Sequence, residues 1–210
     1  MRRLPIYILL DTSGSMRGEP IEAVRTGLRS MLASLSRDPY ALETVFLSII
    51  TFDRDAKVLV PLTELDGFVL PNIDPPETSP TNLGEALELL MKQYRKEVMK
   101  TTMDGKGDWL PLAVIMTDGA PSDTQLFNKM TEELKKYKFA RVVACAAGPK
   151  AKIDPLRKIT HDVVSLDTMD SNSFAKFWQW VSTAVSQQSQ TCDAPHESLP
   201  PPPEEINLVI

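Results

Sequence analysis

Short apolar runs alternate along this 210-residue chain with longer segments in which apolar residues recur every third or fourth position. The first pattern is typical of strands that are buried on both faces, and the second is typical of amphipathic helices. Buried strands are predicted at 6–10, 44–52, 56–60, 112–116, 141–147 and 162–165. Helices are predicted at 20–35, 83–94, 122–134, 154–159 and 174–185.

This order of elements predicts an α/β fold with a doubly wound, mostly parallel, six-stranded sheet of the Rossmann-like kind. One pair of strands departs from the parallel arrangement. Asp53-Arg54-Asp55 is a connection of hairpin length, so the strand at 56–60 is predicted as one antiparallel edge strand. The proline-rich segment 63–80 is predicted as a loop across the top of the sheet. The strand at 162–165 is predicted at the other edge.

Two local signals refine the helices. Ser122-x-x-Gln125 is predicted as a capping box that opens the helix at 122–134. Phe174, Phe177 and Trp178 form an aromatic stripe at helical spacing. Such a stripe is either a binding face or core, and we predict core because a sheet needs a cover.

The composition changes after Val185 and divides the chain in two. Residues 1–186 are predicted as one domain, and 187–210 as a proline-rich tail that contains a polyproline run at 200–203. The tail ends in apolar residues at 206–210. We expect this end to dock, either on the domain's own sheet edge or helix face, or on a partner by adding a strand there.

Charge and composition exclude several classes of function. The formal net charge of −5 argues against a nucleic-acid partner, which requires clustered Lys and Arg. No apolar run is long enough to span a membrane, and the apolar stretch after Arg3 is too short for a signal peptide, so a cytoplasmic location is expected. Cys145 is predicted as a buried hydrophobe. Cys192, His161 and His196 are too scattered for a zinc site.

The candidate chemistry begins where the first strand ends, at Asp11-Thr12-Ser13-Gly14-Ser15. Ligands in open α/β sheets bind at the carboxyl ends of the strands. One acid and two serine hydroxyls on a tight turn are ligands suited to a hard cation such as Mg²⁺ or Mn²⁺. The same residue types are also ordinary in turns and helix caps.

Two later segments favour the metal site. Thr81 opens the helix at 83–94, and Asp118 follows the strand at 112–116 within Thr117-Asp118-Gly119. The three segments in this order resemble the metal-ion-dependent adhesion site of von Willebrand factor type A (VWA) domains. The resemblance covers nearly the whole chain up to the tail.

The resemblance implies a site and a function. Asp11, Ser13, Ser15, Thr81 and Asp118 would supply oxygen ligands to Mg²⁺ (or Mn²⁺), and an Asp or Glu of a partner protein would complete the coordination. The chain would then be a non-catalytic, Mg²⁺-dependent protein-interaction module.

One departure from the family pattern lies beside the predicted threonine ligand. Ser79-Pro80 stands where many relatives have glycines, and proline restricts the residue that precedes it. The threonine loop is therefore expected to be stiffer. Asn82 and Gly119 are expected to shape the loops rather than to bind metal.

Two other functions remain as alternatives. A Mg²⁺-dependent phosphotransferase of the haloacid dehalogenase type also places an aspartate after its first strand. That class needs a second acid two residues later, where this chain has Ser13. The P-loop and G-x-G-x-x-G patterns are absent from the sequence. The second alternative is a metal-independent scaffold that acts through its tail.

The opening segment 2–24 and the ending 199–210 resemble the TerY-like proteins of the tellurium-resistance group. That group is associated with stress response or chemical defence. The resemblance implies a protein kinase and a PP2C-type phosphatase as partners. It does not imply that this chain handles tellurite.

Overall fold

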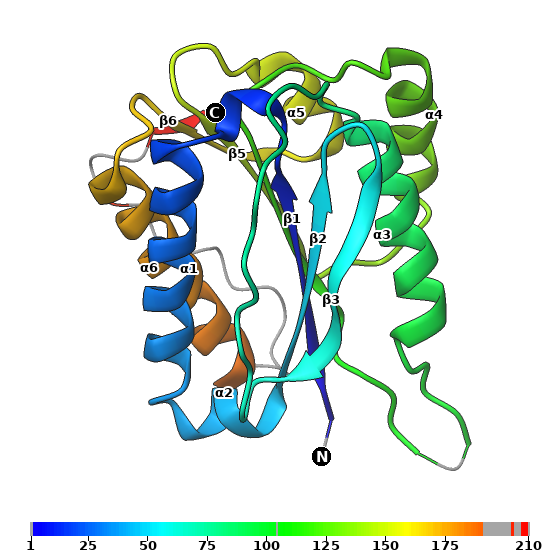
Figure 1. The fold of residues 1–210 in the computed structure, drawn as a ribbon. Coiled ribbons are helices and arrows are strands. Elements are labelled where there is room, and N and C mark those ends of the chain that lie inside the picture. The colour runs from blue at the N-terminus through cyan, green and yellow to red at the C-terminus, as the bar shows by residue number, and fades with distance from the viewer. Residues whose placement is uncertain (1, 104, 191–202, 204–206, 210) are drawn as a thin grey trace.

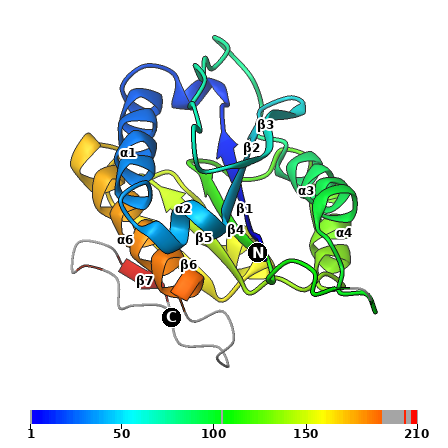
Figure 2. The same ribbon diagram turned by 90° about the horizontal axis from the view of Figure 1, so that it is seen from below.

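A central β-sheet with helices on both faces organises the chain (Figures 1 and 2). The computed structural model describes residues 2–103, 105–190, 203 and 207–209. The strands follow the order β3-β2-β1-β4-β5-β6-β7 across the sheet. Their bounds are β1 Leu4–Asp11, β2 Val45–Phe52, β3 Ala56–Glu64, β4 Leu112–Thr117, β5 Arg141–Ala147, β6 Asp162–Leu166 and β7 Asn207–Val209. The helices are η1 Gly14–Met16 (a 3₁₀ turn), α1 Glu19–Leu35, α2 Pro39–Thr44, α3 Leu83–Glu97, α4 Thr124–Leu134, α5 Ile153–Ile159 and α6 Ser171–Gln190.

The predicted α/β class and its six strands are confirmed. β1 pairs in parallel with β2 and β4, and the parallel pairing continues through β5 to β6. β3 pairs antiparallel to β2 at the sheet edge, as the short connection at 53–55 predicted. β1 runs one residue further than expected, so that Asp11 is its last residue and lies opposite Phe52 of β2.

The two faces of the sheet are covered by different helices. α1 and α6 pack together on one face, and α3 and α4 pack together on the other (Figure 2). The aromatic stripe of α6 is core, because Phe174, Phe177 and Trp178 are all buried. α1 approaches α6 closely at Gly27, where an added Cβ would lie 2.4 Å from a Trp178 ring carbon. The helix continues to Gln190, past the predicted domain end at 186.

The loop between β3 and α3 takes a different path from the predicted one. Because β3 runs antiparallel to β2, its last residue lies at the end of the sheet where the parallel strands begin, away from their carboxyl ends. The chain must therefore run back along the sheet to begin α3, and it does so in front of the sheet, beside α1 (Figure 1). Leu65 and Ile73 of this loop are buried in the same cluster as the apolar side of α1. The prediction of a loop across the top of the sheet was wrong in this respect.

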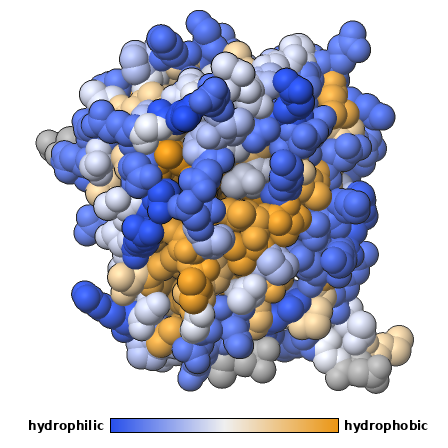
Figure 3. Space-filling model, viewed as in Figure 1, coloured by the Kyte–Doolittle hydropathy of each residue, from blue (hydrophilic) through white to orange (hydrophobic). Residues whose placement is uncertain are grey.

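The β3 side of the molecule is visibly apolar (Figure 3). Leu59 and Val60 of β3 and Phe68 and Leu70 of the following loop are only partly buried, and Val69 is 80% exposed. β3 also contains Pro61, which has no N–H to offer to a further strand. A proline of this kind protects an edge strand against pairing with another chain.

The end of the tail forms a seventh strand. β7 pairs antiparallel to β6, with Val209 opposite Val163 and Asn207 opposite Ser165 (Figure 2). Docking on the domain's own sheet edge is therefore confirmed for 207–209. The prediction that β6 is an edge strand was wrong, because β7 lies beyond it. Cys192 and His196 lie outside the described residues, as does the remainder of 191–202, 204–206 and 210.

Two further expectations concern burial and membranes. Cys145 is buried in β5, as predicted, and burial raises the pKa of its thiol. Within the described residues, no helix combines the length and the apolar character that crossing a membrane requires.

Candidate metal centre

Asp11 occupies the carboxyl end of β1, and its side chain is held from two directions. One carboxylate oxygen, Oδ1, accepts a hydrogen bond from the backbone N–H of Ser13 at 2.8 Å. The other, Oδ2, accepts one from Oγ1 of Thr117 at 2.5 Å. Asp11 is only 1% exposed. These bonds join the ends of the neighbouring strands β1 and β4 through one buried carboxylate.

The two predicted serine ligands lie beside the second acid. The hydroxyl oxygens of Ser13 and Ser15 are 3.2 Å apart, and the Ser15 hydroxyl donates to Oδ1 of Asp118 at 2.9 Å. Gly14 allows this turn to pack tightly, because a Cβ there would lie 3.0 Å from the carbonyl oxygen of Glu77. The turn after β1 is thus connected to the turn after β4.

Thr81 reaches the same place from the loop before α3. Its backbone N–H donates to the Ser122 hydroxyl at 3.1 Å, and its carbonyl accepts from the N–H of Ser122 at 2.8 Å. Its Oγ1 lies close to Gly119, since a Cβ added to that glycine would be 3.2 Å away. The structure therefore brings all five predicted site residues to one edge of the sheet.

Ser122 and Asp123 have roles that the sequence reading missed. Ser122 accepts from Thr81 instead of capping α4, so the predicted capping box was wrong. Asp123 stands at the start of α4, but its carboxylate accepts from the N–H groups of Gly84 and Glu85 at 3.0 and 2.9 Å. Asp123 thus caps the beginning of α3 from the neighbouring helix. A helix-start acid is an ordinary sequence signal, and nothing local indicates that it serves another helix.

A second group of supporting contacts comes from the turn between β2 and β3. Asp53 accepts hydrogen bonds from the Thr12 and Ser79 hydroxyls, both at 3.2 Å. Asn82 donates its backbone N–H to the carbonyl of Asp53 at 2.8 Å and its side-chain amide to the carbonyl of Arg54 at 2.7 Å. The expected loop-shaping role of Asn82 agrees with these contacts. Together they hold the threonine loop against the end of the sheet.

The electrostatics of the site favour a bound cation. Burial raises the pKa of Asp11 to about 6, although hydrogen bonds from Ser13 and Thr117 lower it. Burial also raises the pKa of Asp118, although the hydrogen bond from Ser15 and the charge of Lys150 lower it. Within 2–103 and 105–190, neither carboxylate forms an ion pair with Lys or Arg. Two buried acids that form no ion pair are costly unless a cation neutralises them.

The donor set fits a hard divalent cation. Two carboxylates and three hydroxyls are all oxygen donors, which suit Mg²⁺ or Mn²⁺ better than softer metals. In the described part of the chain, no three or more His, Cys, Asp or Glu side chains gather as a metal-binding group. Any metal bound at this edge would therefore depend on the hydroxyls of Ser13, Ser15 and Thr81.

The raised pKa of Asp11 predicts a pH dependence of metal binding. A proton and a metal ion compete for this carboxylate, so affinity should decline as the pH falls through about 6. For a single competing proton, binding of Mn²⁺ at pH 5 should be about tenfold weaker than at pH 7.5. Calorimetric titration of Mn²⁺ at the two pH values measures this ratio. An affinity that is constant between pH 5 and 7.5 would contradict the role given to Asp11.

Comparison with known proteins identifies the family. The model of the von Willebrand factor type A domain family matches residues 6–179, which is most of the chain. The chain belongs to this family. A search of curated proteins found no match.

Several solved structures share the fold. The VWA protein of Catenulispora acidiphila superposes with a TM-score of 0.65 at 14% identity, covering 88% of this chain and 43% of that one. A mutant of the PilB minor pilin from Streptococcus sanguinis gives 0.67 at 12% identity, covering 93% and 64%. Proximal thread matrix protein 1 from the mussel byssus, with a zinc-occupied MIDAS motif, gives 0.62 at 16% identity, covering 90% and 46%. The chain thus spans less than half of the mussel and Catenulispora chains, and at such identities the likeness concerns the fold.

Proposed function

We propose that this VWA domain is a non-catalytic, Mg²⁺-dependent protein-interaction module. In this proposal Asp11, Ser13, Ser15, Thr81 and Asp118 hold Mg²⁺ (or Mn²⁺). The ion would supply an electrophilic centre that accepts a carboxylate oxygen from an Asp or Glu of the partner protein. The observation that carries the proposal is the meeting of two buried, unpaired acids with three hydroxyls at the carboxyl edge of the sheet.

The burial of the individual residues supports an approach from one side. Asp11 and Ser13 are almost fully buried, whereas Ser15 is exposed. The two acids balance the charge of a divalent ion, and the three hydroxyls are neutral. A partner carboxylate would therefore meet the ion from the Ser15 side, where solvent has access. The pilus adhesin SpaC of Lactobacillus rhamnosus, which shares the fold at 12% identity, and the metal-occupied mussel protein are consistent with this proposal.

The chemistry of the site favours binding over catalysis. A phosphotransferase of the haloacid dehalogenase type would need an acid at position 13, and the hydroxyl of Ser13 cannot act as a general acid and base at neutral pH. The groups that hydrogen-bond to Asp11 are the backbone N–H of Ser13 and the hydroxyl of Thr117, which orient the carboxylate and are not general acids or bases at neutral pH.

We extend the proposal to the partners on sequence resemblance alone. Segments 2–24 and 199–210 resemble TerY-like proteins, so a tellurium-resistance or stress-response system is the proposed setting. A protein kinase and a PP2C-type phosphatase are then the first partners to test.

Removal of one hydroxyl ligand tests the proposed mechanism. Thr81→Val keeps the shape of the side chain but removes its oxygen, and capture of a purified partner in Mg²⁺ should fall at least about tenfold, because a metal contact is lost. Thr78→Val is the matched control, since Thr78 is exposed on the same loop. Surface plasmon resonance in Mg²⁺ and in EDTA measures both variants.

Three results would contradict the proposal. One is partner binding that persists in EDTA, which would favour the metal-independent scaffold. Another is equal loss for Thr81→Val and Thr78→Val. The third is Mg²⁺-dependent phosphatase activity that Asp11→Asn removes, which would favour the phosphotransferase.

A further inference from the structure

A cavity lies between the carboxyl ends of α3 and α4, at the opposite ends of these helices from the candidate metal centre. Its volume is about 590 Å³, and its lining consists of Tyr94, Arg95, Lys100, Lys136, Tyr137 and Lys138. Four of the six lining residues are cationic and none is acidic. In a chain with a formal net charge of −5, this concentration of exposed positive charge makes the cavity locally attractive to anions.

Most of this charge is not neutralised by the protein. Lys136 forms an exposed ion pair with Glu133 at 2.6 Å. Arg95 donates to the Tyr137 hydroxyl rather than to an acid. Within 2–103 and 105–190, no carboxylate forms an ion pair with Arg95, Lys100 or Lys138. Three cations therefore face the cavity without an acidic partner in the described residues.

The ordinary explanation for cations at a helix end covers only part of the cluster. Arg95 lies in the last turn of α3, where positive charge interacts favourably with the helix dipole. Lys100 and Lys138 lie beyond the ends of the two helices, on separate loops. They come together only because these loops meet, which helix stabilisation does not require.

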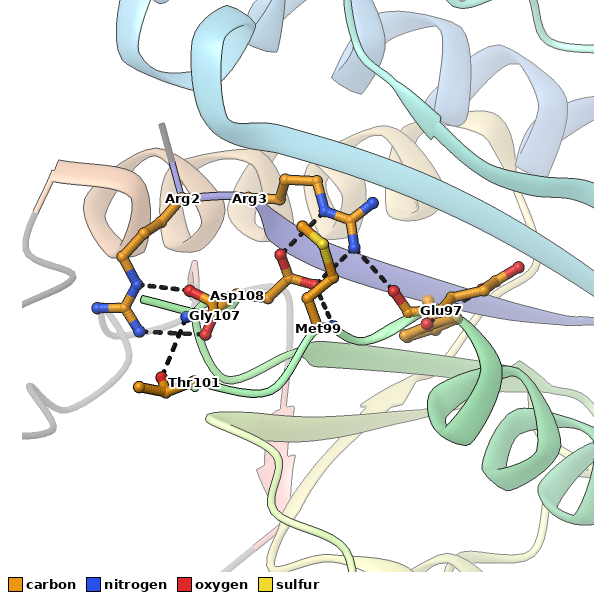
Figure 4. A network of polar contacts seen from close by, with 8 residues as sticks. Arg2, Arg3, Glu97, Met99, Thr101, Gly107 and Asp108 are labelled. Carbon is orange, nitrogen blue, oxygen red and sulfur yellow. Dashed lines mark hydrogen bonds and ion pairs between the residues drawn. The ribbon is translucent and has the colours of Figure 1, made fainter. Parts of the chain in front are cut away.

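The loop that carries Lys100 is held in place by a partly buried polar network (Figure 4). Arg3 donates two hydrogen bonds to Asp108, at 2.9 and 2.7 Å, and one to the carbonyl of Glu97 at 2.7 Å. Asp108 in turn accepts from the backbone N–H of Met99 at 2.8 Å. Gly107 packs against the same stretch, where a Cβ would lie 2.4 Å from the carbonyl carbon of Lys100. The backbone at Lys100 is therefore positioned before any ligand binds.

The opposite wall is positioned by aromatic contacts. The rings of Tyr94 and Tyr137 meet edge to face, with centroids 5.2 Å apart. The Tyr94 hydroxyl donates to the carbonyl of Lys138 at 3.0 Å, which holds the backbone at that lysine. Preorganised walls reduce the entropy that a ligand must lose on binding.

We propose that this cavity binds a phosphate dianion, either free or carried on an organic ligand. Three unpaired cations would leave positive charge uncompensated around a single carboxylate, whereas a phosphate carries close to two negative charges and three acceptor oxygens. Lys and Arg side chains are the usual donors to such groups. The site is independent of the metal centre and of the function proposed for it.

Calorimetry in EDTA and low salt tests the site with two probes. They are inorganic phosphate and a short peptide with one phosphoserine, with the unphosphorylated peptide as reference. The double variant Lys100→Gln/Lys138→Gln should weaken binding of the phosphorylated probe at least about tenfold, because charge-assisted hydrogen bonds are lost. The matched control is Lys106→Gln/Lys135→Gln, which removes two exposed lysines from the same parts of the chain outside the cavity lining.

The two probes distinguish the sources of the phosphate. Binding of the peptide without binding of inorganic phosphate assigns the site to phosphorylated side chains, and equal binding assigns it to free phosphate. If both double variants weaken binding equally, the probe is attracted by the general positive charge of this region and not by a specific site. That result would overturn the proposal. The proposal would also be overturned if neither probe shows saturable binding to wild-type protein that has a normal unfolding midpoint. Lys138→Gln alone repeats the test with a smaller change, since Lys138 is exposed and does not support the core.

Discussion

Asp11→Asn is expected to abolish binding of Mg²⁺ and Mn²⁺ while making the metal-free protein more stable at neutral pH. The substitution removes one of the two charged ligands, so affinity should fall at least about 100-fold. It also removes a buried charge that has no cationic partner among the described residues. The asparagine oxygen can still accept from the N–H of Ser13, and its amide NH2 can donate to the hydroxyl of Thr117, which would then act as an acceptor.

The direction of the stability change follows from the pKa of Asp11. It is about 6 in the folded protein and 3.8 in an unperturbed chain, so the folded state binds more protons between these values. The free energy of unfolding of the metal-free wild type therefore decreases as the pH rises from about 4 to about 6. The loss at pH 7.5 is up to about 3 kcal/mol, and Asp11→Asn should recover much of it.

Urea unfolding in EDTA at pH 7.5, with calorimetric titration of Mn²⁺, measures both effects. Asp55→Asn is the matched control, because Asp55 is an exposed acid in the nearby β2–β3 turn and should change neither quantity. Undiminished Mn²⁺ binding in Asp11→Asn would exclude this residue as a ligand. A metal-free variant that is less stable than the wild type would contradict the assigned electrostatics.

Asp108→Ala is expected to destabilise the fold by about 3 kcal/mol or more, because it breaks a buried ion pair and leaves its partner uncompensated. The Asp108 side chain is completely buried, and that of its partner Arg3 is 23% exposed. The same carboxylate accepts the N–H of Met99, so its loss also frees the loop that carries Lys100. Mn²⁺ affinity should not change, since the network lies at the other end of the sheet.

Chemical denaturation of three variants measures the contribution of the pair. Asp108→Asn should be less damaging than Asp108→Ala, because an amide oxygen can still accept from Met99. Glu133→Ala removes an exposed acid from a surface ion pair and should have little effect. Equal unfolding midpoints for Asp108→Ala and Glu133→Ala would show that the buried network is not important for stability.

Much of the fold and the grouping of the candidate site could be predicted from sequence because their signals are local. The apolar run before Asp11 is a buried strand, and the run before Asp118 is another. Parallel strands bring their carboxyl ends to one edge, so two acids at such ends lie at the same edge, and the pairing of β1 with β4 makes them neighbours. The hairpin between β2 and β3 followed from its short connection in the same way.

The failures concern residues whose partners are distant in the chain. Ser122 and Asp123 have the sequence of a helix start, yet they bind Thr81 and cap α3. The path of the loop after β3 depends on where an antiparallel strand ends, and its buried residues depend on α1.

The sequence by itself thus determined most of the strands and helices, though not α2 or β7, and the acids and hydroxyls available at the strand ends, because periodicity and residue type are properties of neighbouring positions. Only the tertiary structure decided which of these groups meet. Ser15 reaches Asp118 across 103 positions, and Arg3 reaches Asp108 across 105. Contacts over such separations depend on how the sheet and its helices pack, which no local pattern specifies.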